Sequence, residues 1–408
     1  MDGPTVCNVH HRRTTGEGDA PLQRGCATSR GGGDDYAYEV NGSTREAIAR
    51  HVRRFPPVVW ARKSAWRRAL LAVGGALVLV GIAFVLIGRA AKFGEVTEAA
   101  ARGNKLWFPI CLLGEVLAYA GYILAYRDVA RAEGGPELDL WTVTRIVVLG
   151  FGAVVVGSGA GGLAVDFWAL RRAGAGAHGS TRRVLALNTL EWGVISFWAA
   201  LAGLAVLLGA GEGVPLAMAL AWLCVVPACV VAAAWTTQAV RVKALTAIPH
   251  GPPARGLLPR GRHALRIAFA DAIGGVLLVR HIVLRPMAYP AALIGFPIYW
   301  LGDLVTLYGG LRAFGVTIGV APLVLAYTTS YVATALPLPF AGAGGIEAAL
   351  TLTLHLVGVP LAAALLGVLV YRLFSLWLPI VPALLFLPSI ESLEKDVEAV
   401  SRRARHAA

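Results

Sequence analysis

The sequence predicts an all-α polytopic membrane protein, an inverted-repeat helix bundle with broken or re-entrant helices. Of its 408 residues, 57% are hydrophobic and only 15% are charged, and the mean hydropathy of +0.64 is far from the balance of a soluble globular domain. A spanning helix needs roughly 20 mostly apolar residues, because the hydrocarbon core is about 30 Å thick. Several stretches reach that length, and the order of their features occurs twice along the chain.

Apolar segments occupy most of the chain after residue 68. They are residues 69–88, 106–126, 143–165, 184–209, 215–236, 288–312, 319–336, 346–358 and 361–388. Residues 263–285 carry Arg266, Asp271 and Arg280 among apolar residues, so we expect a helix that lies in the membrane interface. The predicted organisation has three parts. These are a disordered, basic cytoplasmic tail over residues 1–64, a membrane domain over residues 65–390 and a cytoplasmic C-terminal tail over residues 391–408.

The formal charge of +13 is best explained by the positive-inside rule. Lys and Arg cluster in the loops between apolar segments, without the interleaved aromatic residues expected for nucleic-acid binding. Residues 50–68 are basic and contain no acid, which places the N-terminus in the cytoplasm. Residues 241–285 are also basic, whereas residues 210–214 hold only Glu212. These assignments require residues 143–170 to form a re-entrant hairpin on the cytoplasmic side. They place the protein in the cytoplasmic membrane with both termini in the cytoplasm.

Two parts of the chain resemble each other. Residues 108–115 read FPICLLGE and residues 296–303 read FPIYWLGD, while GAGGL at residues 159–163 matches GAGGI at residues 342–346. In the predicted topology the two copies cross the membrane in opposite directions, as in the inverted repeats of transporters. Short apolar strings also match by chance in a sequence dominated by Ala, Gly, Leu and Val. The predicted repeats cover about residues 106–209 and 288–388.

Two glycine-rich stretches predict breaks in the membrane helices. Each Gly in a helix interior costs about 1 kcal/mol relative to Ala, and proline removes a backbone donor. Broken backbone at membrane depth must be shielded by protein or face a polar cavity, and free amides at half-helix ends can hold a phosphate. The residues of these breaks are Gly159, Gly161 and Gly162 in the first half, and Pro337, Pro339, Gly342, Gly344 and Gly345 in the second.

Charged residues inside apolar segments are the main candidates for a substrate path, because intramembrane charges are costly and by default functional. They are Glu115, Glu191, Asp303, Glu347 and Arg372. Glu115 and Asp303 take matching places in the two repeats and are expected to gate the path or relay protons. The alternative is that these charges form fixed ion pairs between helices, and Glu347 is also placed to cap a helix N-terminus.

Polar and aromatic residues beside these charges give weaker signals. Tyr119 and Tyr122 follow Glu115 at helical spacing and are expected to line the same path. Tyr126 fits an interfacial aromatic belt equally well. Asp166 follows the first break, and we interpret it as an interfacial cap.

No catalytic, cofactor or metal site is predicted. The five cysteines show no disulfide or zinc pattern, and Cys7 with His10 and His11 is set aside as a chance cluster. The apolar segments contain no Asp-x-x-Asp pair and no His-x-x-x-x-Asp acyltransfer motif. An integral membrane enzyme is therefore the weakest of the functions considered.

The second break and the helices after it resemble the lysylphosphatidylglycerol synthase transmembrane, or flippase-like, family. The matching residues are Pro337, Pro339, Gly342, Gly344, Gly345, Glu347, Gly358, Val359, Pro360, Tyr371, Arg372 and Pro379. Phe340-Ala341 replaces the usual Gly-Gly pair of the motif. The resemblance covers about residues 65–390, and we expect the membrane part alone, without a synthase domain.

The resemblance implies a flippase-like transporter of a phospholipid or a polyprenyl-linked glycolipid, with anionic membrane lipids as its partners. The alternative is a membrane protein that does not transport but acts as the partner or regulator of a lipid-modifying enzyme. The Ala, Arg and Gly richness suggests a bacterium with a GC-rich genome.

Overall fold

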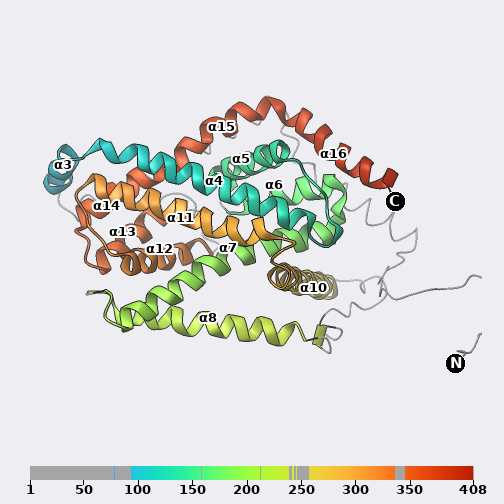
Figure 1. The fold of residues 1–408 in the computed structure, drawn as a ribbon, viewed down its shortest axis with the longest axis horizontal. Coiled ribbons are helices and arrows are strands. Elements are labelled where there is room, and N and C mark those ends of the chain that lie inside the picture. Colours follow the sequence, from blue (N-terminus) through green and yellow to red (C-terminus); the bar gives the residue numbers. More distant parts are fainter. Residues whose placement is uncertain are drawn as a thin grey trace, which may run out of the picture. The chain divides into compact units, whose positions relative to one another are not determined.

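The computed structural model describes residues 78, 93–157, 159–211, 213–238, 241–242, 245, 257–335 and 345–407. These residues form helices joined by short loops, and no strand occurs among them (Figure 1). The predicted all-α polytopic class is confirmed, since five helical stretches in this part of the chain are long and apolar enough to cross a membrane. The predicted N-terminal tail, with Cys7, His10 and His11, lies outside the described residues, as does the first apolar segment except for residue 78.

The helices follow the predicted apolar segments closely. They are α3 (Phe93–Ala101), α4 (Phe108–Arg131), α5 (Leu140–Gly157), α6 (Gly159–Leu170), α7 (Gly176–Leu207), α8 (Leu216–Thr236), α10 (Leu257–Val283), α11 (Pro290–Ala313), α12 (Val320–Ala335), α13 (Ile346–Leu356), α14 (Leu361–Arg372), α15 (Leu378–Phe386) and α16 (Ile390–Ala407). A π-helical turn, η3 (Arg171–Ala175), joins α6 to α7, and another, η5 (Leu373–Trp377), joins α14 to α15.

Helices α4 and α11 form the closest helix pair, and they are antiparallel (Figure 1). A Cβ atom on Gly302 would lie 2.4 Å from the carbonyl oxygen of Gly114, and one on Gly295 would lie 2.4 Å from that of Gly121. Glycine is therefore required at these positions, as in the small-residue contacts of other membrane helices. Gly114 and Gly302 are also equivalent residues of the proposed repeats. Contact between equivalent residues on antiparallel helices is what a two-fold axis in the membrane plane produces, which supports an inverted repeat.

The first glycine-rich stretch gives a tight hairpin of α5 and α6. Gly159, Gly161 and Gly162 lie within the first turn of α6 instead of in an unwound segment. A Cβ on Gly161 would lie 2.2 Å from the carbonyl oxygen of Ala153 on α5. These glycines therefore act mainly by letting α6 approach α5.

In the second half, α12 and α13 also pack against each other. Gly345 immediately precedes α13. The remaining predicted break residues, Pro337, Pro339, Gly342 and Gly344, lie outside the described residues.

The predicted C-terminal tail, residues 391–408, falls almost entirely in helix α16, which packs on the bundle. Arg145 of α5 donates a hydrogen bond of 2.9 Å to Asp396, and Arg172 of η3 forms an ion pair with Glu398. Leu393 of α16 is fully buried. The sequence analysis missed this packing because α16 has too few apolar residues to resemble a membrane segment, although its apolar residues do share one face.

Helix α10 covers the segment expected to lie in the membrane interface. It packs on α7, where Gly274 faces the side chain of Arg182 and Gly275 faces Leu185. These glycines let a basic helix approach a membrane helix closely. Its position in the interface stays a prediction.

We predict that Gly302→Ala destabilises the fold, because the new Cβ collides with the backbone of α4 and forces the two helices apart. A lower melting temperature and a smaller monodisperse fraction in detergent are expected. The matched control is Gly193→Ala on α7, where a Cβ meets nothing within 4 Å and helix propensity favours Ala. Equal melting temperatures for Gly302→Ala and the wild type would contradict the proposed packing.

Candidate functional site

A cavity of about 210 Å³ lies inside the bundle, between the two proposed repeats. Helices α4 to α7 contribute to its lining from the first half, and helices α11 to α14 and η5 contribute from the second. Its ionisable and amide lining residues are Glu115, Asp166, Asn188, Glu191, Asp303 and Arg372. Residues spread over most of the chain thus meet at one site.

Most of the predicted path residues belong to this cavity. Glu115, Tyr122, Glu191 and Asp303 line it together with Arg372. Glu347 adjoins it through its ion pair with Arg372. Tyr119 is not among the lining residues, and its ring packs on Phe151, with the ring centroids 4.9 Å apart. Tyr122 lines the cavity. That both tyrosines line a substrate path stays a prediction.

Arg372 and Glu347 form a buried ion pair at the edge of the cavity. The Nε of Arg372 donates to Oε1 of Glu347 over 2.8 Å, and their side chains are only 6% and 2% exposed. Glu347 lies in the first turn of α13, as expected. Arg372 ends α14, immediately before the π-helical turn η5, and such turns occur frequently at functional sites. The pair therefore joins α13 to α14 at the cavity.

Asp303 is held by tyrosine hydroxyls. Its Oδ2 accepts a hydrogen bond of 2.9 Å from Tyr371 and another from Tyr327. The hydroxyl of Tyr331 lies 3.0 Å from that of Tyr371. These hydrogen bonds join Asp303 of α11 to α12 and α14. The sequence analysis missed Tyr327 and Tyr331, although their spacing of four residues places both on one face of α12.

Glu115 occupies the repeat position equivalent to Asp303 but has different surroundings. Its side chain is 7% exposed, and its Oε2 has no hydrogen-bond partner among the residues that the structure describes. The two acids are therefore alike in position but unlike in their hydrogen bonding.

Asp166 is a cavity residue, so its interpretation as an interfacial cap is wrong. It is 6% exposed, and its Oδ1 lies 3.8 Å from where a Cβ on Gly150 would stand. The hairpin of α5 and α6 places Asp166 in the cavity lining. The hydropathy of the sequence does not show this placement. Glu191 approaches from α7, and its backbone carbonyl accepts a 2.7 Å hydrogen bond from the indole of Trp300.

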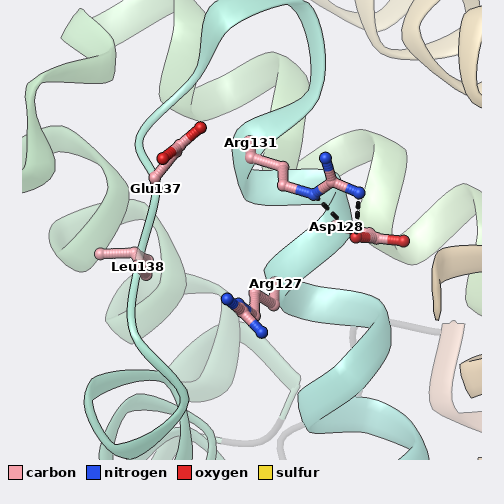
Figure 2. A pocket seen from close by; sticks show the side chains of 5 residues that line it. All are labelled: Arg127, Asp128, Arg131, Glu137 and Leu138. Atoms are coloured by element: carbon pink, nitrogen blue, oxygen red, sulfur yellow. Dashed lines mark hydrogen bonds and ion pairs between the residues drawn. The ribbon is translucent and has the colours of Figure 1, made fainter. Parts of the chain in front are cut away.

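A second cavity of about 280 Å³ lies at the C-terminal end of α4 (Figure 2). Its charged lining residues are Arg127, Asp128, Arg131 and Glu137. Figure 2 shows the guanidinium of Arg131 turned toward Asp128, with Nε and Oδ1 2.8 Å apart. The other oxygen of Asp128 accepts from the backbone N–H of Ala292 over 3.0 Å. Because this network ties α4 to the start of α11, we assign it a structural role.

The fold and the cavity define a polytopic helical membrane protein with buried charges around an internal cavity. Residues 66–383 match the family described as the lysylphosphatidylglycerol synthase TM region, and the chain belongs to this family. No curated protein matches the chain. The family resemblance predicted from the sequence is confirmed, and all residues of the central cavity fall within the matched range.

We predict that separating the buried ion pair destabilises the protein. Glu347→Gln leaves the Arg372 charge buried without its carboxylate, and loss of one partner of such a pair costs about 3–5 kcal/mol. The double variant Glu347→Gln/Arg372→Gln is expected to lose less stability than the two single variants together, as measured by thermal unfolding in detergent.

The control for this cycle is Glu98→Gln on α3, which removes an exposed ion pair with Arg102 and should change stability little. Strictly additive losses at positions 347 and 372 would show that the contact between them contributes nothing.

Proposed function

We propose that the protein moves a phosphate-bearing lipid across the cytoplasmic membrane in a flippase-like manner, and that both termini face the cytoplasm. The observation that carries this proposal is the internal cavity, whose ionisable side chains come from both repeats. A lipid headgroup needs a polar route through the hydrocarbon core, whereas its acyl chains can stay in the bilayer.

The cavity volume fits this division of the substrate. At about 210 Å³ it is smaller than the roughly 300–1,000 Å³ of sites that enclose drug-sized ligands. It has room for part of a headgroup but not for acyl chains. The surrounding helices expose many large apolar side chains, including Leu117 and Leu124 of α4, which suits contact with lipid.

Arg372 is the proposed phosphate ligand. It supplies the positive charge among the described residues that line the cavity, and a guanidinium can bind phosphate through two parallel hydrogen bonds. A phosphate that approaches Arg372 competes with the carboxylate of Glu347 for the same group. Binding a headgroup would then loosen the link between α13 and α14, which couples occupancy to a change in the bundle.

The two helical hairpins are the proposed moving parts. Helices α5 and α6 form one wall of the cavity, while α12 and α13 contribute Tyr331 and Ile346 on the other side. Inverted repeats let two related halves exchange roles as a site opens first to one face and then to the other. We propose transport without a catalytic step, in keeping with a family that is defined by a transmembrane region.

We predict that Gly150→Leu stops lipid transfer without unfolding the protein. The new side chain would enter the cavity, because a Cβ on Gly150 has no neighbour closer than 3.8 Å. Lipid transfer is measured in proteoliposomes that contain fluorescent phosphatidylglycerol or a polyprenyl-phosphate analogue. Arg372→Ala should also lose transfer, because it removes the proposed phosphate ligand.

The control is Gly193→Leu, which adds the same side chain to an open surface of α7 and should keep wild-type transfer. If Gly150→Leu transfers lipid at the wild-type rate, the headgroup does not pass through this cavity. If the folded wild type moves neither lipid, the proposed transport of these lipid classes is wrong.

A further inference from the structure

We infer that Glu115 is a proton-binding site and that its proton and a lipid phosphate in the cavity favour each other's binding. This inference rests on the proposed function, because it names the ion that accompanies the lipid. It begins from the charges of the cavity.

The cavity holds many more carboxylates than cations. Glu115, Asp166, Glu191 and Asp303 line it together with one guanidinium, that of Arg372. That guanidinium is already paired with a fifth acid, Glu347. Full ionisation would leave four negative charges of this set uncompensated. Because neighbouring carboxylates in a low-dielectric site cannot all ionise, protons must occupy some of them.

The remaining titratable groups around Glu115 do not supply the missing positive charge. The lining residues of α5 are apolar, namely Val147, Gly150, Phe151 and Val154. The other lining groups that can titrate are tyrosines, whose hydroxyls are neutral at physiological pH. They are Tyr122 of α4, Tyr299 of α11 and Tyr331 of α12.

The burial of an unpaired carboxylate oxygen distinguishes Glu115 from Asp166 and Glu191 as the proton carrier. Asp303 accepts hydrogen bonds from Tyr327 and Tyr371, and Glu347 accepts one from Arg372. The side chain of Glu115 is only 7% exposed, yet its Oε2 has no donor within the described part of the chain. A bare carboxylate is costly in such a place, and the neutral carboxylic acid costs much less.

The linkage to lipid follows from charge. A phosphate at Arg372 adds negative charge to the cavity and so makes ionisation of Glu115 less favourable. Linkage is reciprocal, so a proton on Glu115 makes phosphate binding more favourable. The proton comes from water on the side where the headgroup enters, resides on a carboxylate oxygen, and returns to water where the headgroup leaves. Lipid and proton therefore move in the same direction.

The first test measures lipid transfer in proteoliposomes under a pH gradient. The wild type should drive fluorescent phosphatidylglycerol toward the alkaline side, by at most about tenfold per pH unit if one proton moves with each lipid. Glu115→Gln resembles the protonated acid, so it should still transfer lipid but with equal distributions under opposite gradients. The control, Glu98→Gln, changes an exposed acid of α3 and should keep the wild-type response. Wild-type transfer that ignores the gradient would overturn proton coupling while lipid transport itself stands.

The second test does not depend on transport. Infrared spectra of the purified wild type at neutral pH should show a protonated carboxyl band that grows on addition of short-chain phosphatidylglycerol and is reduced in Glu115→Gln. Absence of a wild-type response to this lipid would overturn the linkage, whether or not lipid moves in vesicles. If the band responds but the wild type moves no lipid, the linkage stands and the transport proposal fails. If Glu115→Gln does not fold, the response of the wild-type carboxyl band to added lipid decides whether the linkage exists.

Discussion

The contact between α4 and α11 is the constraint on which the cavity depends. The backbones meet where Gly114 faces Gly302, and each of these glycines is followed directly by an acid of the cavity, Glu115 or Asp303. The closest approach of the two helices therefore also fixes the positions of the two acids. Any side chain larger than hydrogen at either glycine would separate the helices and, with them, the acids. Packing and charge placement are thus set by one short sequence element, used twice.

The two proposed repeats share a backbone arrangement but differ in how their charges are satisfied. In the second repeat, Asp303 accepts from tyrosines and Glu347 pairs with Arg372. In the first, Glu115 has an oxygen without a described partner, and Asp166 lies in the cavity wall. A transporter with strictly identical halves would hold equal charges on both sides of its site. Under the proposed proton coupling, this difference places the hydrogen-bonded acids in one half and the proton-binding Glu115 in the other.

The sequence predicts this fold well because the bilayer makes strong demands on it. The length of the apolar segments predicted the helices. Charges are costly inside such segments, and this cost pointed to Glu115, Glu191, Asp303 and Arg372, which line the cavity. The sequence could not show which side of each helix faces the cavity. Asp166 was misassigned because it reaches the cavity only through the packing of α6 against α5. Tyr119 shares a helix with Glu115, yet it turns toward Phe151.

Helix α16 shows a further limit of linear patterns and has consequences for movement. Arg145 is buried in α5 and bonds to Asp396, and it precedes by two residues Val147, which lines the cavity. Arg172, just beyond α6, holds the same helix through Glu398. Both arms of the α5 and α6 hairpin are thus joined to α16 by ion pairs. If the proposed transport moves this cavity wall, the wall must carry α16 with it or break the ion pair between Arg145, which is buried, and Asp396, which is half exposed. The charges of α5 and η3 thereby join the wall to the C-terminal helix.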